Sequence, residues 1–236
     1  MNILSLETSA KAVSCAVVSD GTPIASAWQQ TGLTHSRTLM PMVEAMLKNS
    51  DMALRDMDAV AVAAGPGSFT GLRIGIAAAK GLAWGAEMPC IAVSTLEAMA
   101  TPLSHLEGQL ILCAMDARRQ QIYNALFLAQ EGALTRLAED RAIALEELAA
   151  ELAEEARPIT IVGDGAALCH DFLSKAGISC HLAPVHLRAQ SAVGVGLAAW
   201  PLAQAGAFLT TQELAPVYLR LSQAEREQLE KLRGQK

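Results

Sequence analysis

Three acidic residues, Glu7, Asp116 and Asp164, each stand in a polar turn directly after an apolar, strand-like run. Ligands of α/β folds bind where strands end, so these carboxylates are candidates for contacts to a metal–nucleotide complex. Acidic residues are also common in turns, because their side chains accept hydrogen bonds from nearby backbone N–H groups. Both interpretations stay open at this point.

The second chemical feature is a glycine motif, Gly65-Pro66-Gly67-Ser68-Phe69-Thr70-Gly71-Leu72-Arg73. It predicts the end of a strand at 59–64, a turn stiffened by Pro66, and a helix that Ser68 caps and that continues through 74–86. Exposed N–H groups at a helix start attract anions. The motif lacks the Gly-Lys-Ser/Thr ending of a P-loop and the G-x-G-x-x-G spacing. Phosphate binding and a purely structural turn are equally compatible with it.

The helix after this turn is rich in small residues. Gly71, Gly75 and Ala79 recur four apart, so another backbone can approach that face closely. Each interior glycine costs ~1 kcal/mol against alanine, so the helix needs packing support. That support comes either from its own sheet or from a second protein.

Other catalytic residue types give little support to a hydrolase. No serine lies in G-x-S-x-G, and no histidine pair forms H-E-x-x-H, so no metal site is expected. The five cysteines are scattered through apolar runs without a C-x-x-C pair, as expected of reduced core residues. They are Cys15, Cys90, Cys113, Cys169 and Cys180.

The elements that must position these residues form an α/β pattern. Three strands at 2–6, 12–18 and 24–28 precede a methionine-rich amphipathic helix at 33–49. The strand and helix of the glycine motif follow, then a strand at 90–93 and a helix with a capping box at 94–97. This first lobe is expected to span 1–102 and to have a mixed sheet.

The second lobe is expected to span 103–236. Strands at 110–115 and 122–128 repeat the opening hairpin, which suggests an old duplication. An acidic surface helix is predicted at 137–155, a strand at 159–162, and helices at 166–176 and 191–206, the last interrupted near Pro201. The charged end, 222–236, is expected to be a solvated helix or frayed tail.

Composition limits the classes of partner. The 236 residues are 52% hydrophobic and 18% charged, with a net charge of −6 and a pI of about 5.4. No global basic field exists to hold nucleic acid, so a role on tRNA is expected to need a partner. Neither a signal peptide nor a membrane-crossing apolar span is evident, and a cytoplasmic location is expected.

Four motifs together resemble the bacterial TsaB (YeaZ) family over essentially the whole chain. The glycine motif is the most specific of them. The others are Ile3-Leu4-Ser5-Leu6-Glu7-Thr8-Ser9, Met115-Asp116-Ala117-Arg118 and Pro216-Val217-Tyr218-Leu219-Arg220.

The resemblance implies an actin-like/sugar-kinase-like ATPase fold (ASKHA, ribonuclease H-like) with two lobes and a reduced second lobe. It also implies an essential, non-catalytic subunit. That subunit binds TsaD, with TsaE joining, in the complex that forms threonylcarbamoyladenosine next to the anticodon of tRNAs reading ANN codons. When alone, such a subunit forms a homodimer through the same helices.

Several residues depart from working members of the superfamily. Glu7, Thr8 and Ser9 replace an aspartate turn with glycine, and Asp116 begins a second loop without glycine, so these residues are interpreted as a vestigial nucleotide loop. Gly163-Asp164-Gly165 is a thin remnant of an adenosine loop. Of the two-histidine metal motif of TsaD only His35 remains. The isolated chain is therefore expected to bind no cofactor, while ATP or ADP at the interface of the complex stays open.

The resemblance also assigns a partner-binding surface to the first two helices. Methionine suits such a surface because its flexible side chain adapts to more than one partner. The residues expected there are His35, Leu39, Met42, Val43, Met46, Leu72, Ile76 and Ala79, whereas Gly65, Pro66, Gly67 and Gly71 are expected to form the structural turn.

Two other functions remain as alternatives. An ATP-dependent small-molecule kinase of the same fold would need intact phosphate loops. A glycoprotease-like metallopeptidase would need the missing second histidine.

Overall fold

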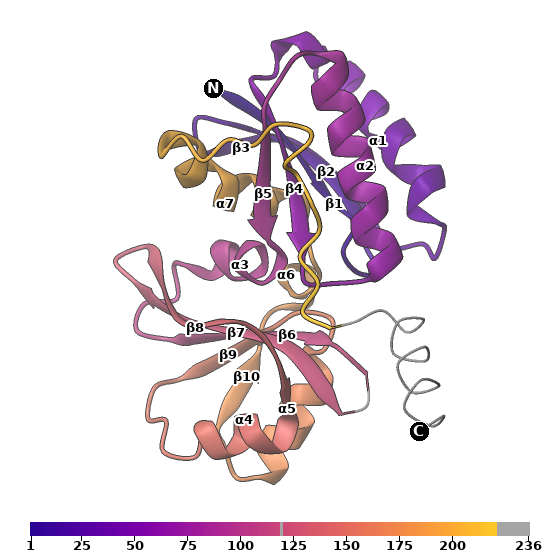
Figure 1. Ribbon diagram of the computed structural model, residues 1–236. Coiled ribbons are helices and arrows are strands. Elements are labelled where there is room, and N and C mark those ends of the chain that lie inside the picture. The colour runs from indigo at the N-terminus through magenta and orange to yellow at the C-terminus, as the bar shows by residue number, and fades with distance from the viewer. Residues whose placement is uncertain (119, 221–236) are drawn as a thin grey trace, which may run out of the picture.

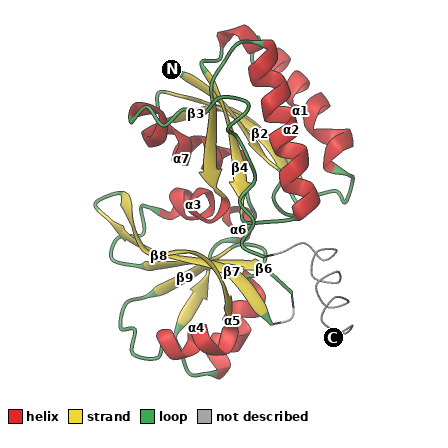
Figure 2. Ribbon diagram, in the orientation of Figure 1, coloured by secondary structure: helices red, strands yellow, loops and turns green. Residues whose placement is uncertain are grey.

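The computed structural model describes residues 1–118 and 120–220. In these residues the chain forms two five-stranded sheets, one in each lobe, with helices packed on both (Figures 1 and 2).

The first sheet is mixed, with the order β3-β2-β1-β4-β5. β1 is antiparallel to β2 and parallel to β4, and both β1 and β4 are almost entirely buried, as expected of central strands covered on both faces. The elements of this part of the chain are β1 (Asn2–Glu7), β2 (Val13–Ser19), β3 (Thr22–Gln29), α1 (His35–Asn49), η1 (Leu54–Asp56), β4 (Ala59–Gly65), α2 (Phe69–Gly85), β5 (Cys90–Ser94), α3 (Thr95–Ala100) and η2 (Thr101–Leu103).

The second sheet repeats this topology with the order β8-β7-β6-β9-β10. β6 is antiparallel to β7 and parallel to β9, as β1 is to β2 and β4. The duplication suggested by the opening hairpins therefore extends to all five strands. The elements of this part of the chain are β6 (Leu110–Asp116), β7 (Gln121–Gln130), β8 (Ala133–Ala144), α4 (Leu145–Glu151), β9 (Ile159–Val162), α5 (Ala166–Lys175), β10 (Cys180–Leu182), α6 (Val185–Arg188) and α7 (Ala192–Gln204).

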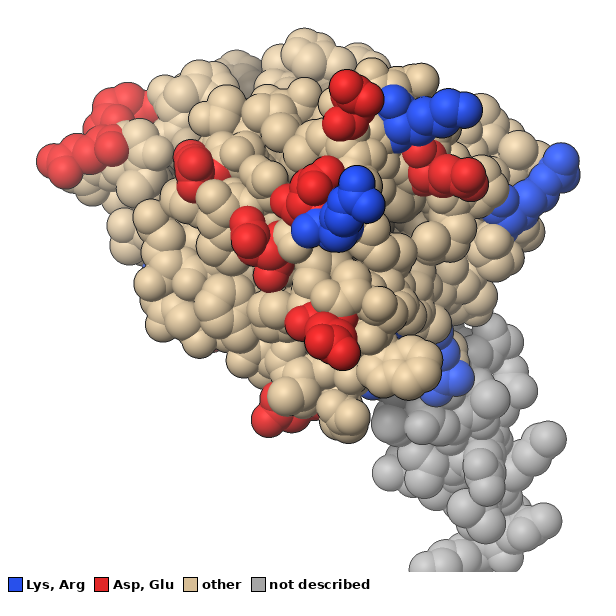
Figure 3. All heavy atoms as spheres, turned by 90° about the horizontal axis from the view of Figure 1, so that it is seen from above, with Lys and Arg blue, Asp and Glu red and all other residues tan. Residues whose placement is uncertain are grey.

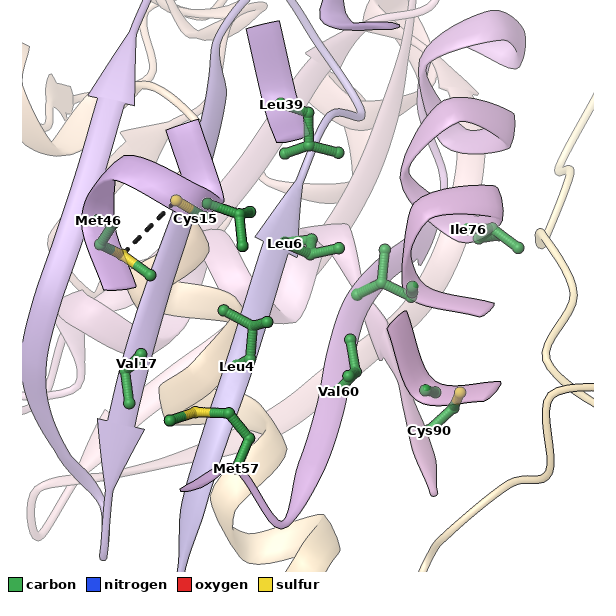
Figure 4. Close-up of a cluster of buried hydrophobic side chains, with 14 of the residues drawn as sticks. Leu4, Leu6, Cys15, Val17, Leu39, Met46, Met57, Val60, Ile76 and Cys90 are labelled. Atoms are coloured by element: carbon green, nitrogen blue, oxygen red, sulfur yellow. Dashed lines mark hydrogen bonds between the residues drawn. The ribbon is translucent and has the colours of Figure 1, made fainter. Parts of the chain in front are cut away.

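Helices α1 and α2 cover one face of the first sheet, and α7 covers the other. Figure 4 shows part of the α1 and α2 side, where Met46 of α1 lies beside Cys15 of β2 with 3.6 Å between their sulfur atoms. Helix α3 lies between the lobes, because Leu96 and Met99 pack on the second sheet while Ala98 packs against α7. The two sheets therefore have separate cores that meet at α3.

The C-terminal part of the chain returns to the first lobe. α7 packs on the first sheet, Leu209 forms a bridge with Cys90 of β5, and Val217 N–H donates to Ala64 of β4 at 2.7 Å. A cut after residue 102 separates the two sheets, but residues from α7 to Val217 belong with the first lobe. This corrects the simple division into 1–102 and 103–236, because strand order along the chain does not reveal a return crossing.

Two predicted elements of the second half differ in the structure, and two further elements were not predicted. Residues 133–144, placed partly in a helix at 137–155, form β8, and only Leu145–Glu151 is helical. Pairing with β7 overrides the helix preference of this Ala- and Glu-rich segment, whose side chains alternate in exposure. Pro201 lies inside a continuous α7, and β10 and α6 were not predicted.

The charged end at 222–236, expected to be a solvated helix or frayed tail, lies outside the described residues. Within the described part of the chain, none of the helices combines the length and apolar character needed to cross a bilayer.

Candidate functional site

The lobes enclose a cavity of about 700 Å³. Its walls come from the ends of β1 and β6, from the turn before α2, and from the segment that follows Pro216 (Figure 1). Each of the four sequence motifs therefore contributes residues to one cavity, although Ser9 and Arg220 come from distant parts of the chain. Asp116 and Asp164 line the same cavity.

The first loop is closed. Glu7, Thr8 and Ser9 have no exposed surface, and Ser9 N–H donates to Glu7 Oε1 at 2.5 Å. Burial raises the pKa of Glu7 to about 7, against the opposing effect of the hydrogen bonds from Ser9. Glu7 Oε2 and Ser9 Oγ have no protein partner among the described residues. Glu7 is thus held beneath the cavity wall, where a phosphate group would not reach it.

The glycine turn explains this closure. A Cβ on Gly71 would overlap the carbonyl oxygen of Thr8, and one on Gly75 would overlap the Thr8 hydroxyl, which donates to Gly71 O at 2.8 Å. A Cβ on Gly67 would lie 2.6 Å from Ser9 O. The first two turns of α2 therefore lie flat on the β1 loop.

Ser68 caps α2 as predicted, since its Oγ accepts the Gly71 N–H at 3.3 Å. Gly65 has φ of +135°, and a Cβ there would overlap the carbonyl oxygen of Val217. The C-terminal segment is therefore part of the reason for glycine at this position.

The second loop is open. Asp116 is exposed at the end of β6, where its Oδ1 accepts the Arg118 N–H at 2.7 Å. Asp164, after β9, is solvent-accessible at the cavity wall and accepts a hydrogen bond from Gln190 at 3.0 Å. Protein atoms crowded around the carboxyl raise the pKa of Asp164, and the negative charge of Asp116 raises it further. Asp116, the last residue of β6, and Asp164, which follows β9, therefore meet at one cavity, while Glu7, the last residue of β1, lies beneath its wall.

Convergence does not make a metal site. Among the residues that the structure describes, no group of three His, Cys, Asp or Glu side chains has a geometry that could hold a metal ion. His35 instead bonds through Nε2 to Ala10 O at 2.7 Å. The five cysteines are buried and unpaired, and burial raises the pKa of the Cys15 thiol to about 12, so thiolate chemistry at neutral pH is not supported there.

A C-terminal strap, Val217–Arg220, closes one side of the cavity. Tyr218 stacks on Phe69 with 4.7 Å between ring centroids, and Arg73 lies 3.9 Å over the same Phe69 ring while donating to Tyr218 OH at 3.0 Å. Arg220 donates to Ala117 O of the second lobe at 2.6 Å. The strap therefore ties α2 to the second lobe. Its motif is evident in the sequence, but its packing against Phe69 and Arg73 was not predicted.

Six of the eight residues expected at a partner surface are core residues in this chain. Leu39, Val43, Met46, Leu72, Ile76 and Ala79 have at most 5% exposure. Met42 is half-buried against the same core, and His35 is intermediate. The expectation that these side chains form a partner-binding surface is therefore corrected. They lie on the faces of α1 and α2 that cover the sheet, because the apolar periodicity of a helix identifies the side that packs on the core.

The outer face of α2 is mostly apolar and was not predicted. Ile74, Ala77, Gly81, Trp84 and Gly85 follow helical spacing, with exposed Arg73 and partly exposed Lys80 beside them, and Trp84 is 78% exposed. A Cβ on Gly81 or Gly85 would meet nothing within 4 Å. The sequence contains a signal for this face, because Gly81 lies away from the side of α2 that Gly71 and Gly75 share.

Comparison with known proteins gives one consistent result. The family model described as "TsaD: tRNA N6-adenosine threonylcarbamoyltransferase" matches residues 29–228. The tRNA threonylcarbamoyladenosine biosynthesis protein TsaB of Bacillus subtilis is 33% identical, with 98% of this chain and 99% of that protein covered.

Solved structures agree. YeaZ from Pseudomonas aeruginosa superposes with a TM-score of 0.80 and 26% identity, covering 92% of this chain and 99% of that one. The activator of 2-hydroxyisocaproyl-CoA dehydratase from Clostridium difficile, at a TM-score of 0.50 and 12% identity, covers 88% of this chain and 97% of its own and shows the fold alone. The duplicated lobes are those of the actin-like ATPase fold, with two mixed sheets.

Proposed function

The chain belongs to the TsaB (YeaZ) family, and from that premise we propose that it serves tRNA threonylcarbamoyladenosine biosynthesis as a non-catalytic subunit. Its task is to bind and support TsaD, with TsaE joining the complex, so that adenosine next to the anticodon of tRNAs reading ANN codons is modified. The cytoplasm is the compartment of this activity.

The single observation that carries the non-catalytic role is the closed first loop. Glu7 and Thr8 are fully buried, and α2 lies on them through Gly71 and Gly75. A nucleotide phosphate at this loop needs free backbone N–H groups and space. Glu7, Thr8 and Ser9 have no exposed surface, and the Ser9 N–H is already bonded to Glu7. ATP or ADP in the assembled complex would then be held at the interface with TsaD rather than here.

The outer face of α2 supports the docking role. Glycine in a helix interior costs ~1 kcal/mol, and Gly81 and Gly85 have no internal packing to offset that cost. A partner helix approaching closely would supply the packing. Exposed Trp84 adds a large aromatic side chain of the kind enriched at protein interfaces.

We place TsaD on this face and the homodimer on the same face, so that one assembly excludes the other. Met42 of α1 also belongs to this docking surface. Its side chain is half-buried, so it packs against the core and can also contact a partner. Met42→Glu would therefore disturb the fold as well as docking. Trp84→Glu is the cleaner change, because it alters a side chain that is 78% exposed.

Co-purification with TsaD followed by a tRNA modification assay tests this proposal. Trp84→Glu should fold, yet lose both TsaD and the homodimer, because a charge buried at an interface without a partner costs about 3–5 kcal/mol. Leu168→Glu is the matched control, since Leu168 is 42% exposed on α5, the equivalent helix of the second lobe. A Trp84→Glu chain that still binds TsaD and itself would exclude the shared face.

Omitting this chain from the reconstituted system should abolish modification, and the chain alone should not turn over ATP. Robust ATP hydrolysis by the pure chain, lost in Asp116→Ala, would favour the kinase alternative. The metallopeptidase alternative requires bound metal in the purified protein, which elemental analysis measures directly.

A further inference from the structure

The mouth of the cavity between the lobes gathers cations in an acidic protein. Lys11, Arg118 and Arg220 line it, and Arg73 adjoins it through Phe69 and Tyr218. None of these four forms a salt bridge with a carboxylate among the described residues. Two of them bond neutral groups instead, the Tyr218 hydroxyl and the Ala117 carbonyl. Within the described part of the chain, Arg73, Arg118 and Arg220 therefore have no carboxylate partner and are available to an external anion, while the charge of Lys11 acts on Asp164.

Aromatic rings lie among these cations. Phe69 is partly exposed, and Tyr218, stacked on it, is 38% exposed. Arg73 lies over the Phe69 ring, which orients its guanidinium at the mouth. An exposed ring beside fixed cations is the arrangement that holds a base and its neighbouring phosphates in single-stranded nucleic acid.

The inside of the cavity has the opposite character. Asp164 and Asp116 stand in its wall, and Glu7 lies beneath. In the described chain no cluster of ligands could hold the cation that would neutralise a triphosphate. Ser9 belongs to the cavity wall, but its side chain is fully buried. The carboxylates of the cavity interior disfavour binding of a free nucleotide, whereas the cations at the mouth favour binding of an anion across the opening.

The start of α2 adds to this field. Residues 66–70 line the cavity, and α2, with 17 residues, directs the positive end of its dipole toward the mouth. Asp116, the exposed carboxylate of the second loop, already accepts a hydrogen bond from the Arg118 N–H. Four cations and a helix N-terminus therefore outnumber Asp116 and Asp164, the two carboxylates of the cavity wall.

Resting on the proposed function, we propose that the rim formed by Lys11, Arg73, Arg118, Arg220 and Tyr218 is a contact site for a single-stranded segment of the tRNA substrate. The cations bind phosphodiester groups, and Tyr218 stacks on an unpaired base. The contact is non-covalent and supplements the grip of TsaD on tRNA. Alone it is weak, in keeping with the acidic charge of the whole chain.

The test measures binding of a fluorescent, unmodified anticodon stem-loop RNA to the complex of this chain with TsaD. Arg118→Glu should weaken binding about three- to tenfold at moderate salt. The slope of log affinity against log salt should fall by about 0.7 for each phosphate group that is no longer neutralised. Lys175→Glu is the matched control: Lys175 is exposed at the end of α5, outside the cavity, and the charge change is the same.

Stacking is tested separately. Tyr218→Phe should retain RNA affinity, whereas Tyr218→Leu should lower it at least about fivefold. Arg118→Gln repeats the charge test with a neutral residue should Arg118→Glu fail to fold or assemble.

The outcomes separate this site from the proposed function. A complex that assembles and modifies tRNA, but binds RNA equally well with Arg118→Glu and Lys175→Glu, overturns the rim and leaves the subunit role intact. Displacement of the RNA by micromolar ATP would make the cavity a nucleotide site, and equal displacement by polyglutamate would make the rim a site for acidic peptides; either result overturns the proposal. Failure of the wild-type chain to bind TsaD overturns the proposed function instead.

Discussion

The two lobes have the same strand order, yet the acid at the end of the central strand meets opposite surroundings in each. Glu7 ends β1 and Asp116 ends β6, and each accepts a hydrogen bond from the N–H two residues later. Glu7 has no exposed surface, whereas Asp116 is exposed at the cavity. Topology therefore fixes where an acid stands, and the packing of neighbouring elements decides whether a ligand can reach it.

The difference arises from the helix that follows the next strand. In the first lobe α2 lies on the Glu7 loop through Gly71 and Gly75, which have no side chain to hold it away. In the second lobe Gly165 approaches the backbone of Met115 and Asp116, but α5 then runs on without interior glycine. The first lobe has closed its loop, and the second has kept its loop open.

The helices that connect the strands also differ between the two lobes, in their length. α1 and α2 have 15 and 17 residues, while α4 and α5 have 7 and 10. The extra length of α2 contains Gly81, Trp84 and Gly85, which are not needed to cover the first sheet. Figure 3, seen from above the first lobe, shows broad uncharged surface between scattered acidic and basic side chains. Among the described elements that flank the second sheet, none is a helix of comparable length.

The largest expected effect comes from reopening the first loop. Gly71→Ala would place a methyl group on the Thr8 carbonyl oxygen, a backbone atom that cannot move without shifting β1. We expect a loss of about 3 kcal/mol of unfolding free energy, the upper part of the range for overpacked cores. Urea denaturation measures it. A change below ~0.5 kcal/mol would mean that α2 does not rest on this loop.

The pH dependence of stability in a Glu7→Gln variant tests the contrast between buried Glu7 and exposed Asp116. Because the pKa of Glu7 rises from 4.5 to about 7 on folding, its contribution to stability is full below pH 4.5 and is lost as pH rises through 7. The Glu7→Gln variant has no ionisable side chain at this position, so its unfolding free energy does not fall in this way as pH rises. In urea denaturation it should exceed the wild type by up to about 3 kcal/mol at pH 8, and the two should converge at pH 4.5.

Asp116→Asn is the control for that experiment. Asp116 is exposed, so the substitution should change the unfolding free energy by less than ~0.5 kcal/mol at pH 8. Equal effects of Glu7→Gln and Asp116→Asn would remove the distinction between a closed and an open loop.

The contact between the lobes is tested at Arg136 of β8. It pairs with Glu97 of α3 at 2.7 Å and Asp140 at 2.6 Å, and lies 4.6 Å over the Phe127 ring. Arg136→Ala should cost about 1–2 kcal/mol, because two partly buried carboxylates lose their partner. Arg157→Ala removes a pair with Glu155 in which the arginine is 40% exposed, against 23% for Arg136, and should cost under ~1 kcal/mol. Thermal unfolding of both variants decides whether the cluster at α3 matters more than a surface pair.

The smallest effect is expected at the far end of α2, and it has the opposite sign. Gly81→Ala should stabilise the isolated chain by ~0.5–1 kcal/mol, since a Cβ there meets nothing and alanine favours the helix. The same change should weaken TsaD binding if a helix packs closely on this face. Stabilisation without any loss of binding would show that Gly81 does not face the partner.

Much of the fold was predictable from the sequence. The alternation of apolar strands and polar turns predicted the five strands of the first sheet and β6, β7 and β9 of the second, and Ser68 and Ser94 marked helix starts that the structure confirms. Helix preference failed at residues 133–144, because pairing with β7 is a contact between segments that local composition does not encode. The return of α7 to the first lobe was missed for the same reason.

For the candidate site, the sequence by itself determined which residue types stand at the ends of β1, β6 and β9, and it supplied the glycines that allow α2 to approach a backbone. Only the tertiary structure decided which backbone that is. It buried Glu7, left Asp116 open, placed the Val217–Arg220 strap against Gly65 and Phe69, and turned Leu39 and Leu72 inward while Trp84 faces out. The physical reason is that burial and charge environment depend on neighbours distant in sequence, whereas spacing along the chain reports only which residues can share a face.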